Sequence, residues 1–445
     1  AGELGRAQIL QAQAAGINPD CRMNPVLLKP STDRGSQVIV LGRPAGFVEA
    51  KDFGSLRARL WERVTGAYAS LSAEHGVMVL EGAGSPGEIN LKKNDIVNMA
   101  MAREAGAKVL LAGDIDRGGL YASFLGTWLT FTPEERRLLA GFLVNRFRGD
   151  PSLLAPAHEY LDRATGAPVL GVIPYIRSLN LPEEDSLSWN GALNAPSAEP
   201  DALNVAVVIL GHTSNYTDMA PLAMEPDVNL RAVRRPSEWG RPDLVIIPGS
   251  RNTALDLAKL RESGLDALIR LHAEKNGWTL GICGGMQVLG EKIRDPLSVE
   301  TRQKSTDGLG LLPLETELAS AKTLRRVENV ATPLGVPASG YEIHHGVTRP
   351  TAEGLTFFGK EEEEGAVLGA GRGRCWGTYL HGLFDNDAFR RAFLNRVRSS
   401  LGLAPREAGL VSYDTERAIS RLASIVRGHT DMDAIYRILG LKGRR

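Results

Sequence analysis

Short apolar runs that end at glycine or a small polar residue recur in the first part of the chain. They lie at Val77–Leu80, Lys108–Ala112, Ala140–Val144 and Pro168–Ile173, and segments of helical length separate them. Such runs are typical of parallel strands that are buried on both faces and connected by helices. The pattern therefore predicts an α/β fold with a doubly wound parallel sheet.

A second series of apolar runs follows further along the chain. Its members are Asn204–Leu210, Leu244–Ile247, Thr279–Ile282 and Cys375–Leu380. We therefore predict a second doubly wound parallel-sheet domain. Glycine makes up 49 of the 445 residues and aromatic residues only 6%, and this excess of glycine fits many tight turns between strands and helices.

Domain boundaries follow from these patterns. Residues 186–201 are rich in Ala, Pro, Ser and Asn and lack periodicity, so we interpret them as a linker. The linker separates a first domain at 1–185 from a second domain at 202–392. In residues 393–445 apolar positions recur at helical spacing, which predicts a C-terminal helical segment.

Charge and cysteine content exclude several classes of protein. Lys plus Arg and Asp plus Glu number 52 each, so the formal net charge is 52 − 52 = 0, which argues against nucleic-acid binding and a polybasic membrane surface. The three cysteines are too widely spaced for a disulfide framework or a metal site. The sequence has no apolar run long enough to span a membrane and no signal-peptide pattern at its start. We expect a cytoplasmic enzyme that acts on small soluble substrates.

The sharpest local motif is Gly-Ile-Cys-Gly-Gly, centred on Cys283. A predicted strand enters it and a predicted helix leaves it, as in a nucleophile elbow, where glycine permits the sharp turn. The start of a helix favours a thiolate, although a small buried side chain would satisfy the same pattern. We predict that Cys283 is a nucleophile and that Gly284 belongs to the oxyanion or substrate-binding region beside it.

Two other strand ends supply partners for this cysteine. Gly249 and Ser250, in Pro-Gly-Ser, offer backbone N–H groups for a developing oxyanion. His381, in Tyr-Leu-His-Gly, is the candidate general base. A histidine at a strand end is more often structural, but its place in the same sheet as the elbow cysteine favours the base.

On these residues the second domain resembles the class I glutamine amidotransferases. The resemblance implies that the Cys283 thiolate attacks the side-chain amide of glutamine, that His381 transfers protons, and that a glutamyl thioester forms as ammonia leaves. In that family a Glu usually follows the histidine by two residues, whereas Leu383 stands there in this chain. Asp385 and Glu342 are acidic candidates for the third member, and the sequence leaves the choice open.

Five motifs in the first half, together with the second domain, resemble the cobyric acid synthase family. They are Gly5–Gln8, Asn24–Pro30, Val79–Leu91, Asp114–Gly119 and Asn145–Asp150. The resemblance implies ATP- and Mg²⁺-dependent amidation of the b, d, e and g carboxylates of adenosylcobyrinic acid a,c-diamide, with ammonia from glutamine, to give adenosylcobyric acid. It also implies a dethiobiotin-synthetase-like, P-loop-type ATPase domain, a corrinoid substrate and no prosthetic group.

Polar side chains at the ends of the first-domain strands are candidate ligands. Carboxylate oxygens suit Mg²⁺, and we assign Glu81 and Asp114 to the metal, with Asp116 as an alternative to Asp114. Arg117 is a candidate for an anionic group of the nucleotide, or a residue of an ordinary surface turn. The resemblance implies that Asn145 contacts adenine, and the alternative is a cap of the next helix.

Lys29 and Arg6 are the candidate contacts for the carboxylates of the corrinoid, although exposed basic residues usually have no specific role. The chain also departs from the family, because it contains no Gly-x-x-x-x-Gly-Lys-[Ser/Thr] phosphate loop. We expect the sequence to be an N-terminally incomplete piece of a longer protein. The alternative is a protein that has lost its phosphate-binding loop.

Three other functions are compatible with the sequence. The first is the related a,c-diamide synthase that acts on cobyrinic acid. The second is a fragment that retains only glutaminase activity, and the third is a regulatory ATPase fold with an inactive amidotransferase domain. The sequence predicts no oligomeric state.

Overall fold

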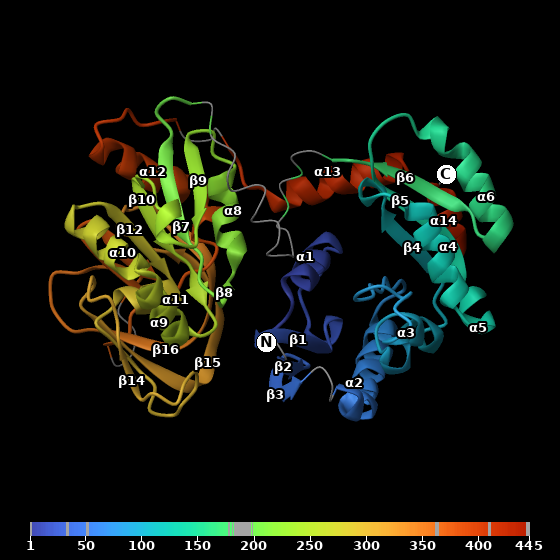
Figure 1. The fold of residues 1–445 in the computed structure, drawn as a ribbon, viewed down its shortest axis with the longest axis horizontal. Helices are drawn as coiled ribbons and strands as arrows, with labels where there is room; N and C mark the ends of the chain where they lie inside the picture. Colours follow the sequence, from blue (N-terminus) through green and yellow to red (C-terminus); the bar gives the residue numbers. More distant parts are fainter. Residues whose placement is uncertain are drawn as a thin grey trace. The chain divides into compact units, whose positions relative to one another are not determined.

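The computed structural model describes residues 2–32, 35–49, 53–176, 179, 181, 197, 199–360, 365–407 and 411–441. The chain forms two compact units, drawn in Figure 1. One unit comprises residues 1–181 and 414–445, and the other comprises residues 182–413. Most of the predicted linker 186–201 lies outside the described residues.

The first unit contains a three-stranded parallel sheet with the strand order β4-β5-β6. The strands are β4 (Val109–Asp114), β5 (Leu139–Phe147) and β6 (Val169–Pro174). They confirm three of the predicted strands, and helices α4 (Leu120–Thr130) and α6 (Ala155–Thr165) connect them. Short helices α3 (Met99–Glu104) and α5 (Pro133–Arg136) precede β4 and β5. The core of this sheet contains Phe124, Phe142, Val144 and Leu161.

A second, antiparallel sheet in the first unit was not predicted. It consists of β1 (Val26–Thr32), β2 (Gly35–Val40) and β3 (Arg43–Glu49), and it shares a core with α2 (Phe53–Glu74). The turn between β2 and β3 places Leu41 at φ 46° and Gly42 at φ 77°. Hairpin turns with two positive φ values usually carry Asn-Gly or Asp-Gly. Because leucine stands at the first of these positions, the sequence carries no sign of a hairpin here.

The apolar run Val77–Leu80, predicted as a strand, is irregular instead. No strand of the described chain pairs with it, and Val79 is 88% exposed. A strand is defined by hydrogen bonds to a neighbour, and apolar residues alone do not supply one. The prediction of a strand was therefore wrong at this segment.

The second unit is built on a seven-stranded sheet with the order β17-β18-β19-β12-β10-β7-β9. Its parallel strands are β7 (Leu203–Val208), β9 (Val228–Val233), β10 (Leu244–Ile247), β12 (Trp278–Ile282) and β19 (Cys375–Thr378). Strands β17 (Thr356–Phe358) and β18 (Gly369–Arg372) extend the sheet in antiparallel fashion. The four strands predicted for this domain are confirmed, and β9 is an addition.

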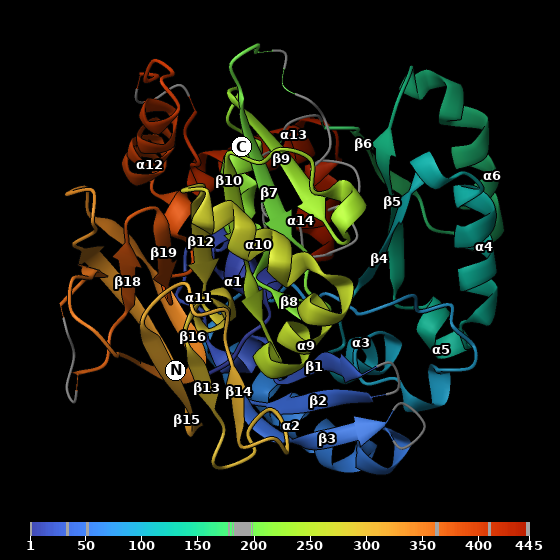
Figure 2. The same ribbon diagram turned by 60° about the vertical axis from the view of Figure 1, so that its left-hand side comes forward.

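Helices cover both faces of this sheet, as predicted for a doubly wound domain. Gly281 faces α11 (Gly284–Leu289), because a Cβ on Gly281 would lie 2.5 Å from the backbone of Gly285. The neighbouring Trp278 stacks edge-on with Phe393 of α12 (Asp387–Ser400), with ring centroids 5.7 Å apart. Side chains of opposite parity in a strand point to opposite faces, so α11 and α12 lie on opposite sides. Figure 2 shows α9 (Thr253–Ser263) and α10 (Leu265–Glu274) in front of the strands.

A long hairpin forms a separate sheet in the second unit. Strand β15 (Leu314–Val330) pairs with β16 (Ala338–Pro350), and β13 (Lys292–Arg294) and β14 (Ser305–Asp307) complete the sheet. Two short strands, β8 (Thr213–Ser214) and β11 (Gly249–Ser250), pair beside the main sheet. The hairpin sheet and the β8–β11 pair both bring segments from distant parts of the sequence to the ends of β10, β12 and β19.

The C-terminal helices are divided between the two units. The sequence predicts one C-terminal helical segment at 393–445 instead. Helix α12 belongs to the second unit, whereas α13 (Thr415–Gly428) and α14 (Met432–Ile438) belong to the first, beside α1 (Arg6–Ala14). The turn between α13 and α14 binds the free edge of β6. Asp431 N donates to Leu170 O at 2.7 Å, and Val172 N donates to His429 O at 3.1 Å. These hydrogen bonds explain why the last helices return to the first unit.

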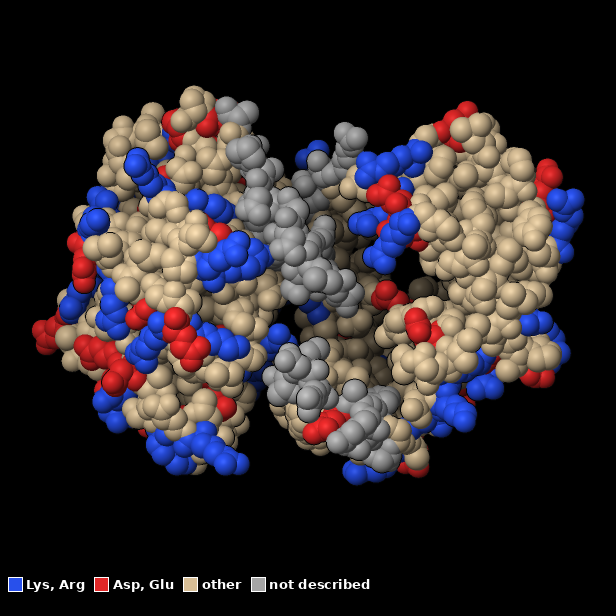
Figure 3. All heavy atoms as spheres, in the orientation of Figure 1, with Lys and Arg blue, Asp and Glu red and all other residues tan. Residues whose placement is uncertain are grey.

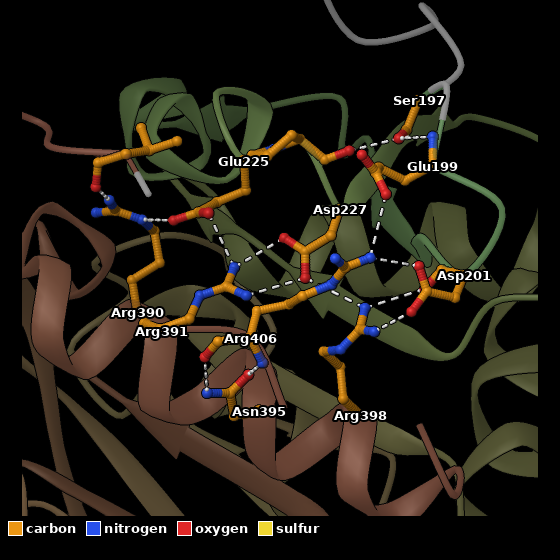
Figure 4. Close-up of polar contacts among 12 residues, drawn as sticks. Ser197, Glu199, Asp201, Glu225, Asp227, Arg390, Arg391, Asn395, Arg398 and Arg406 are labelled. Atoms are coloured by element: carbon orange, nitrogen blue, oxygen red, sulfur yellow. Dashed lines mark hydrogen bonds and ion pairs between the residues drawn. The ribbon is translucent and has the colours of Figure 1, made fainter. Parts of the chain in front are cut away.

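Helix α12 is fixed by buried arginines, shown in Figure 4. Arg390, Arg391 and Arg398 are almost fully buried, and they pair with the buried carboxylates of Glu225 and Asp227. Burial alone would raise the pKa of Asp227, but its hydrogen bond with Arg391 and the charges of Arg391 and Arg398 lower it. Removing one partner of such a buried pair typically costs about 3–5 kcal/mol. The cluster therefore fixes the helix that begins directly after the His381 segment.

The surface is mixed in charge. Figure 3 shows basic and acidic side chains interspersed on the face drawn, as expected for a formal net charge of zero. None of the described helices is long and apolar enough to cross a membrane.

Candidate active site

Cys283 lies between β12 and α11 in a strained backbone conformation. Its φ is 52° and its ψ is −110°, a region that residues other than glycine rarely adopt. Three hydrogen bonds hold this conformation: Cys283 N donates to Thr378 O at 2.7 Å, and Cys283 O accepts from Met286 N at 3.0 Å and from Gln287 N at 3.3 Å. The strand, the sharp turn and the helix together form the predicted nucleophile elbow.

The glycines around Cys283 are required by close backbone contacts. A Cβ on Gly285 would lie 1.9 Å from the carbonyl oxygen of Ile247, and a Cβ on Gly284 would lie 2.8 Å from the amide nitrogen of Ser250. Real Cβ atoms do not approach so closely, so these positions admit no larger side chain. The motif Gly-Ile-Cys-Gly-Gly thus packs the elbow directly against the end of β10 and β11.

His381 follows β19 and is fully buried next to Asp218. Its Nδ1 lies 2.7 Å from Asp218 Oδ2, while the other carboxylate oxygen accepts from Gly382 N at 2.9 Å. The side-chain nitrogen of Asn215 lies 3.0 Å from Nδ1 and 2.9 Å from Nε2. Asp218 accepts a hydrogen bond from Nδ1, so proton transfer is left to Nε2, which the carboxylate does not bind.

The protonation of His381 depends on two neighbours. Burial disfavours the charged ring, but the charge and hydrogen bond of Asp218 and a hydrogen bond with the Cys283 side chain raise the pKa of His381 to about 10. A raised pKa makes the ring a stronger proton acceptor, as a general base requires.

Sequence reasoning missed Asp218. The candidates for the third member were Asp385 and Glu342, but Glu342 binds His344 Nε2 at 3.0 Å and Arg325 Nε at 2.5 Å. Asp218 precedes His381 by 163 positions and belongs to a short turn, Tyr216–Met219. No local motif links the two residues, so only the arrangement of the sheet brings them together.

Strand β16 lines one side of the Cys283–His381 pair. The ring of Tyr341 stacks on His381, with centroids 5.3 Å apart, and the two residues exchange backbone hydrogen bonds of 2.9 and 3.1 Å. The carbonyl oxygen of Ile343 lies 3.7 Å from Cys283 Sγ. The strand therefore contacts both members of the pair.

The predicted oxyanion residues lie beside the same pair. A Cβ on Gly249 would lie 3.3 Å from His381 Cε1, and Gly284 is in contact with the amide of Ser250. The structure thus brings Gly249, Ser250 and Gly284 next to Cys283 and His381. Their role in binding an oxyanion or glutamine stays a prediction.

In the first unit, three of the predicted residues meet at the carboxyl ends of β4 and β5. Asp114 and Asn145 are register neighbours in the parallel pair, and Asp114 Oδ2 lies 3.6 Å from Arg117 Nε. Arg146, which was not predicted, donates to the same carboxylate oxygen at 3.2 Å. This edge is where open parallel sheets usually bind ligands.

The other three predicted residues make separate contacts. Glu81 accepts a hydrogen bond from Gln11, Lys29 pairs with Glu3 at 2.6 Å, and Arg6 begins helix α1. Within the part of the chain that the structure describes, no group of three or more His, Cys, Asp or Glu side chains is arranged as a metal site. The assignment of Glu81 with Asp114 to Mg²⁺ stays a prediction.

Comparison with known proteins identifies the family of the chain. Residues 204–389 match the CobB/CobQ-like glutamine amidotransferase domain. The chain is 46% identical to the cobyric acid synthase of Nitratidesulfovibrio vulgaris, over 100% of this chain and 89% of that protein. It belongs to the cobyric acid synthase family. The cobyric acid synthase of Moorella thermoacetica is 45% identical, over 99% of this chain and 88% of that protein.

A third relative is a two-function protein. It is the adenosylcobalamin biosynthesis bifunctional protein CobDQ of Leptospira interrogans, which is 46% identical over 99% of this chain and 51% of its own length. Members of the cobyric acid synthase family with this domain are amidotransferases, and this chain is such an enzyme. The α/β fold with a glutamine amidotransferase domain is confirmed, whereas the P-loop-type identity of the first unit stays a prediction.

Proposed function

We propose that the second unit hydrolyses glutamine with Cys283 as nucleophile and His381 as acid and base. The observation that carries this proposal is that β16 contacts both the strained elbow cysteine and a buried histidine that pairs with Asp218. An activated nucleophile, a base and a group that orients the base are the parts that nucleophilic catalysis needs.

The reaction follows from these positions. The thiol proton of Cys283 passes to His381 as Sγ attacks the side-chain amide carbon of glutamine, and the backbone amides of Ser250 and Gly284 are the proposed donors to the oxyanion. His381 gives this proton to the leaving nitrogen, the C–N bond breaks, and ammonia departs from a glutamyl thioester. Water then attacks the thioester and gives a proton to His381, which passes it to the departing sulfur, so that glutamate is released and the thiol is restored. Asp218 keeps the ring oriented through both steps.

We further propose that ammonia is transferred to a corrinoid carboxylate. The names of the relatives support cobyric acid synthesis, and the specific substrate would be adenosylcobyrinic acid a,c-diamide with its b, d, e and g carboxylates. A carboxylate is a poor electrophile, and bound ATP with Mg²⁺ supplies the activation that amide formation needs. Lys29 and Arg6 are the proposed contacts for the corrinoid carboxylates.

The residues at the edge of β4 and β5 fit a nucleotide with its metal. Asp114 offers carboxylate oxygens of the kind that Mg²⁺ prefers, and it is only partly buried. Arg117 is 84% exposed, so its guanidinium is free to turn from Asp114 toward a phosphate group. Asn145 lies next to Asp114 in the sheet and is the proposed adenine contact. Glu81 is the second proposed metal ligand.

Isotope transfer tests the proposed function. The protein is incubated with the corrinoid diamide, ATP, Mg²⁺ and glutamine that carries nitrogen-15 in its side-chain amide, and the corrinoid product is analysed by mass spectrometry. We expect nitrogen-15 in four new amides of the corrinoid and one glutamate released for each amide formed. In a parallel incubation with cobyrinic acid, labelled amides at its a and c positions and none on the diamide would contradict the proposed substrate. No labelled amide on either corrinoid would contradict the proposed transfer.

A further inference from the structure

Asp256 is a buried carboxylate outside the Cys283–His381–Asp218 group. It lies in the first half of α9 and is only 1% exposed. A buried carboxylate must be hydrogen-bonded to be tolerated, so its partners show what it holds.

All the hydrogen bonds recorded for this carboxylate come from two loops outside its own helix. Ser250 Oγ donates to Asp256 Oδ2 at 2.7 Å. His212 contributes its backbone N–H, at 3.1 Å from Oδ2, and its ring Nδ1, at 2.9 Å from Oδ1. A helix-dipole role at the start of α9 would need none of these contacts, so Asp256 serves the loops.

The two loops carry different parts of the candidate active site. Ser250 presents its backbone amide toward Gly284, beside the nucleophile. His212 begins the segment that continues through β8 to Asn215 and Asp218, the two residues in contact with His381. Strands β8 and β11 pair directly, and Arg251 N donates to His212 O at 3.0 Å. The hydrogen bonds of Asp256 therefore connect the loop of Ser250, next to the nucleophile, with the segment that carries Asp218, next to the base.

We propose that Asp256 is a positioning residue of the glutaminase reaction. It fixes the Ser250 amide relative to Cys283 and fixes the segment of Asp218 relative to His381. Small displacements matter in such a site, because a shift of about 1 Å in a reacting group can cost about 100-fold in rate. The inference rests on the proposed glutaminase function, and it adds a residue that touches neither glutamine nor the nucleophile.

The test is the variant Asp256→Asn, which keeps the shape but turns one acceptor oxygen into a donor that faces Ser250 or His212. We expect kcat for glutamine hydrolysis to fall about 10- to 100-fold, while KM for glutamine changes less than about threefold and the melting temperature stays within a few degrees. Glu262→Gln is the matched control, since Glu262 is exposed on the same helix, and it should retain the wild-type kcat.

A second variant covers the case in which Asp256→Asn does not fold. Ser250→Ala removes the hydroxyl that donates to Asp256 and accepts from Asn252 N at 2.9 Å. We expect a fall in kcat of about three- to tenfold with KM unchanged. Wild-type kcat in both variants would overturn the proposal, as would a loss of kcat that only accompanies a loss of folded protein. A wild-type protein that hydrolyses no glutamine is a different result, because it would remove the proposed function and this inference with it.

Discussion

Replacing Cys283 with alanine is expected to reduce glutamine hydrolysis by about 1,000-fold or more, because the reaction loses its nucleophile. Alanine fits the site, since it is smaller than cysteine and the backbone hydrogen bonds of Cys283 do not involve the side chain. Amidation of the corrinoid should continue when ammonium chloride replaces glutamine. Glutaminase activity is measured as glutamate released, and amidation as corrinoid product formed.

The matched control for this prediction is Cys21→Ala. Cys21 is a free, partly exposed cysteine in the first unit, so its removal should leave both activities unchanged. A Cys283→Ala variant that still hydrolyses glutamine at the wild-type rate would show that another residue is the nucleophile. A variant that also loses ammonia-dependent amidation would instead indicate damage to the fold.

Replacing Asp218 with asparagine is expected to lower kcat for glutamine hydrolysis by about 100-fold, because the ring of His381 loses its orienting carboxylate. The pKa of His381 should fall from about 10 toward its ordinary value of 6.5, since the charge and hydrogen bond of Asp218 are the largest of the influences that raise it. The high-pH limb of kcat/KM should therefore move to lower pH. Initial rates measured from pH 6 to 11 check both effects.

The His381–Asp218 pair also makes the free energy of unfolding depend on pH. A histidine whose pKa is raised by folding stabilises the folded state fully below about pH 6.5, and this contribution is lost as pH rises through about 10. The wild-type free energy of unfolding should therefore decline over this range more steeply than that of Asp218→Asn. Asp266→Asn, on α10, is the control. An unchanged pH profile in Asp218→Asn would contradict the assigned pairing.

Much of the second unit could be predicted because its chemistry is local. The strands that carry Cys283, Ser250 and His381 are short apolar runs with a clear stop, and glycine marks the elbow. The three residues meet because parallel strands place their carboxyl ends at one edge of a sheet. The structure places these strands side by side in the order β19-β12-β10.

Asp218 and Asp256 could not be found in this way. Neither belongs to a motif, and each acts on residues of another loop through tertiary hydrogen bonds. In the first unit, the apolar run at Val77–Leu80 lacked a pairing partner, and the β2–β3 hairpin used Leu41 where a turn residue was expected. Local patterns identify elements well, but pairing and buried polar contacts depend on the whole fold.

Covalent labelling tests most directly whether Cys283 is the glutamine nucleophile. The protein is incubated with 6-diazo-5-oxo-L-norleucine, an electrophilic analogue of glutamine, and its peptides are analysed by mass spectrometry with and without excess glutamine. We predict one adduct per chain, on Cys283, that glutamine prevents, with Cys21 and Cys375 unmodified. Burial raises the pKa of Cys375 to about 12, so it should remain an unreactive thiol. An adduct at another residue, or none at Cys283, would contradict the proposed active site.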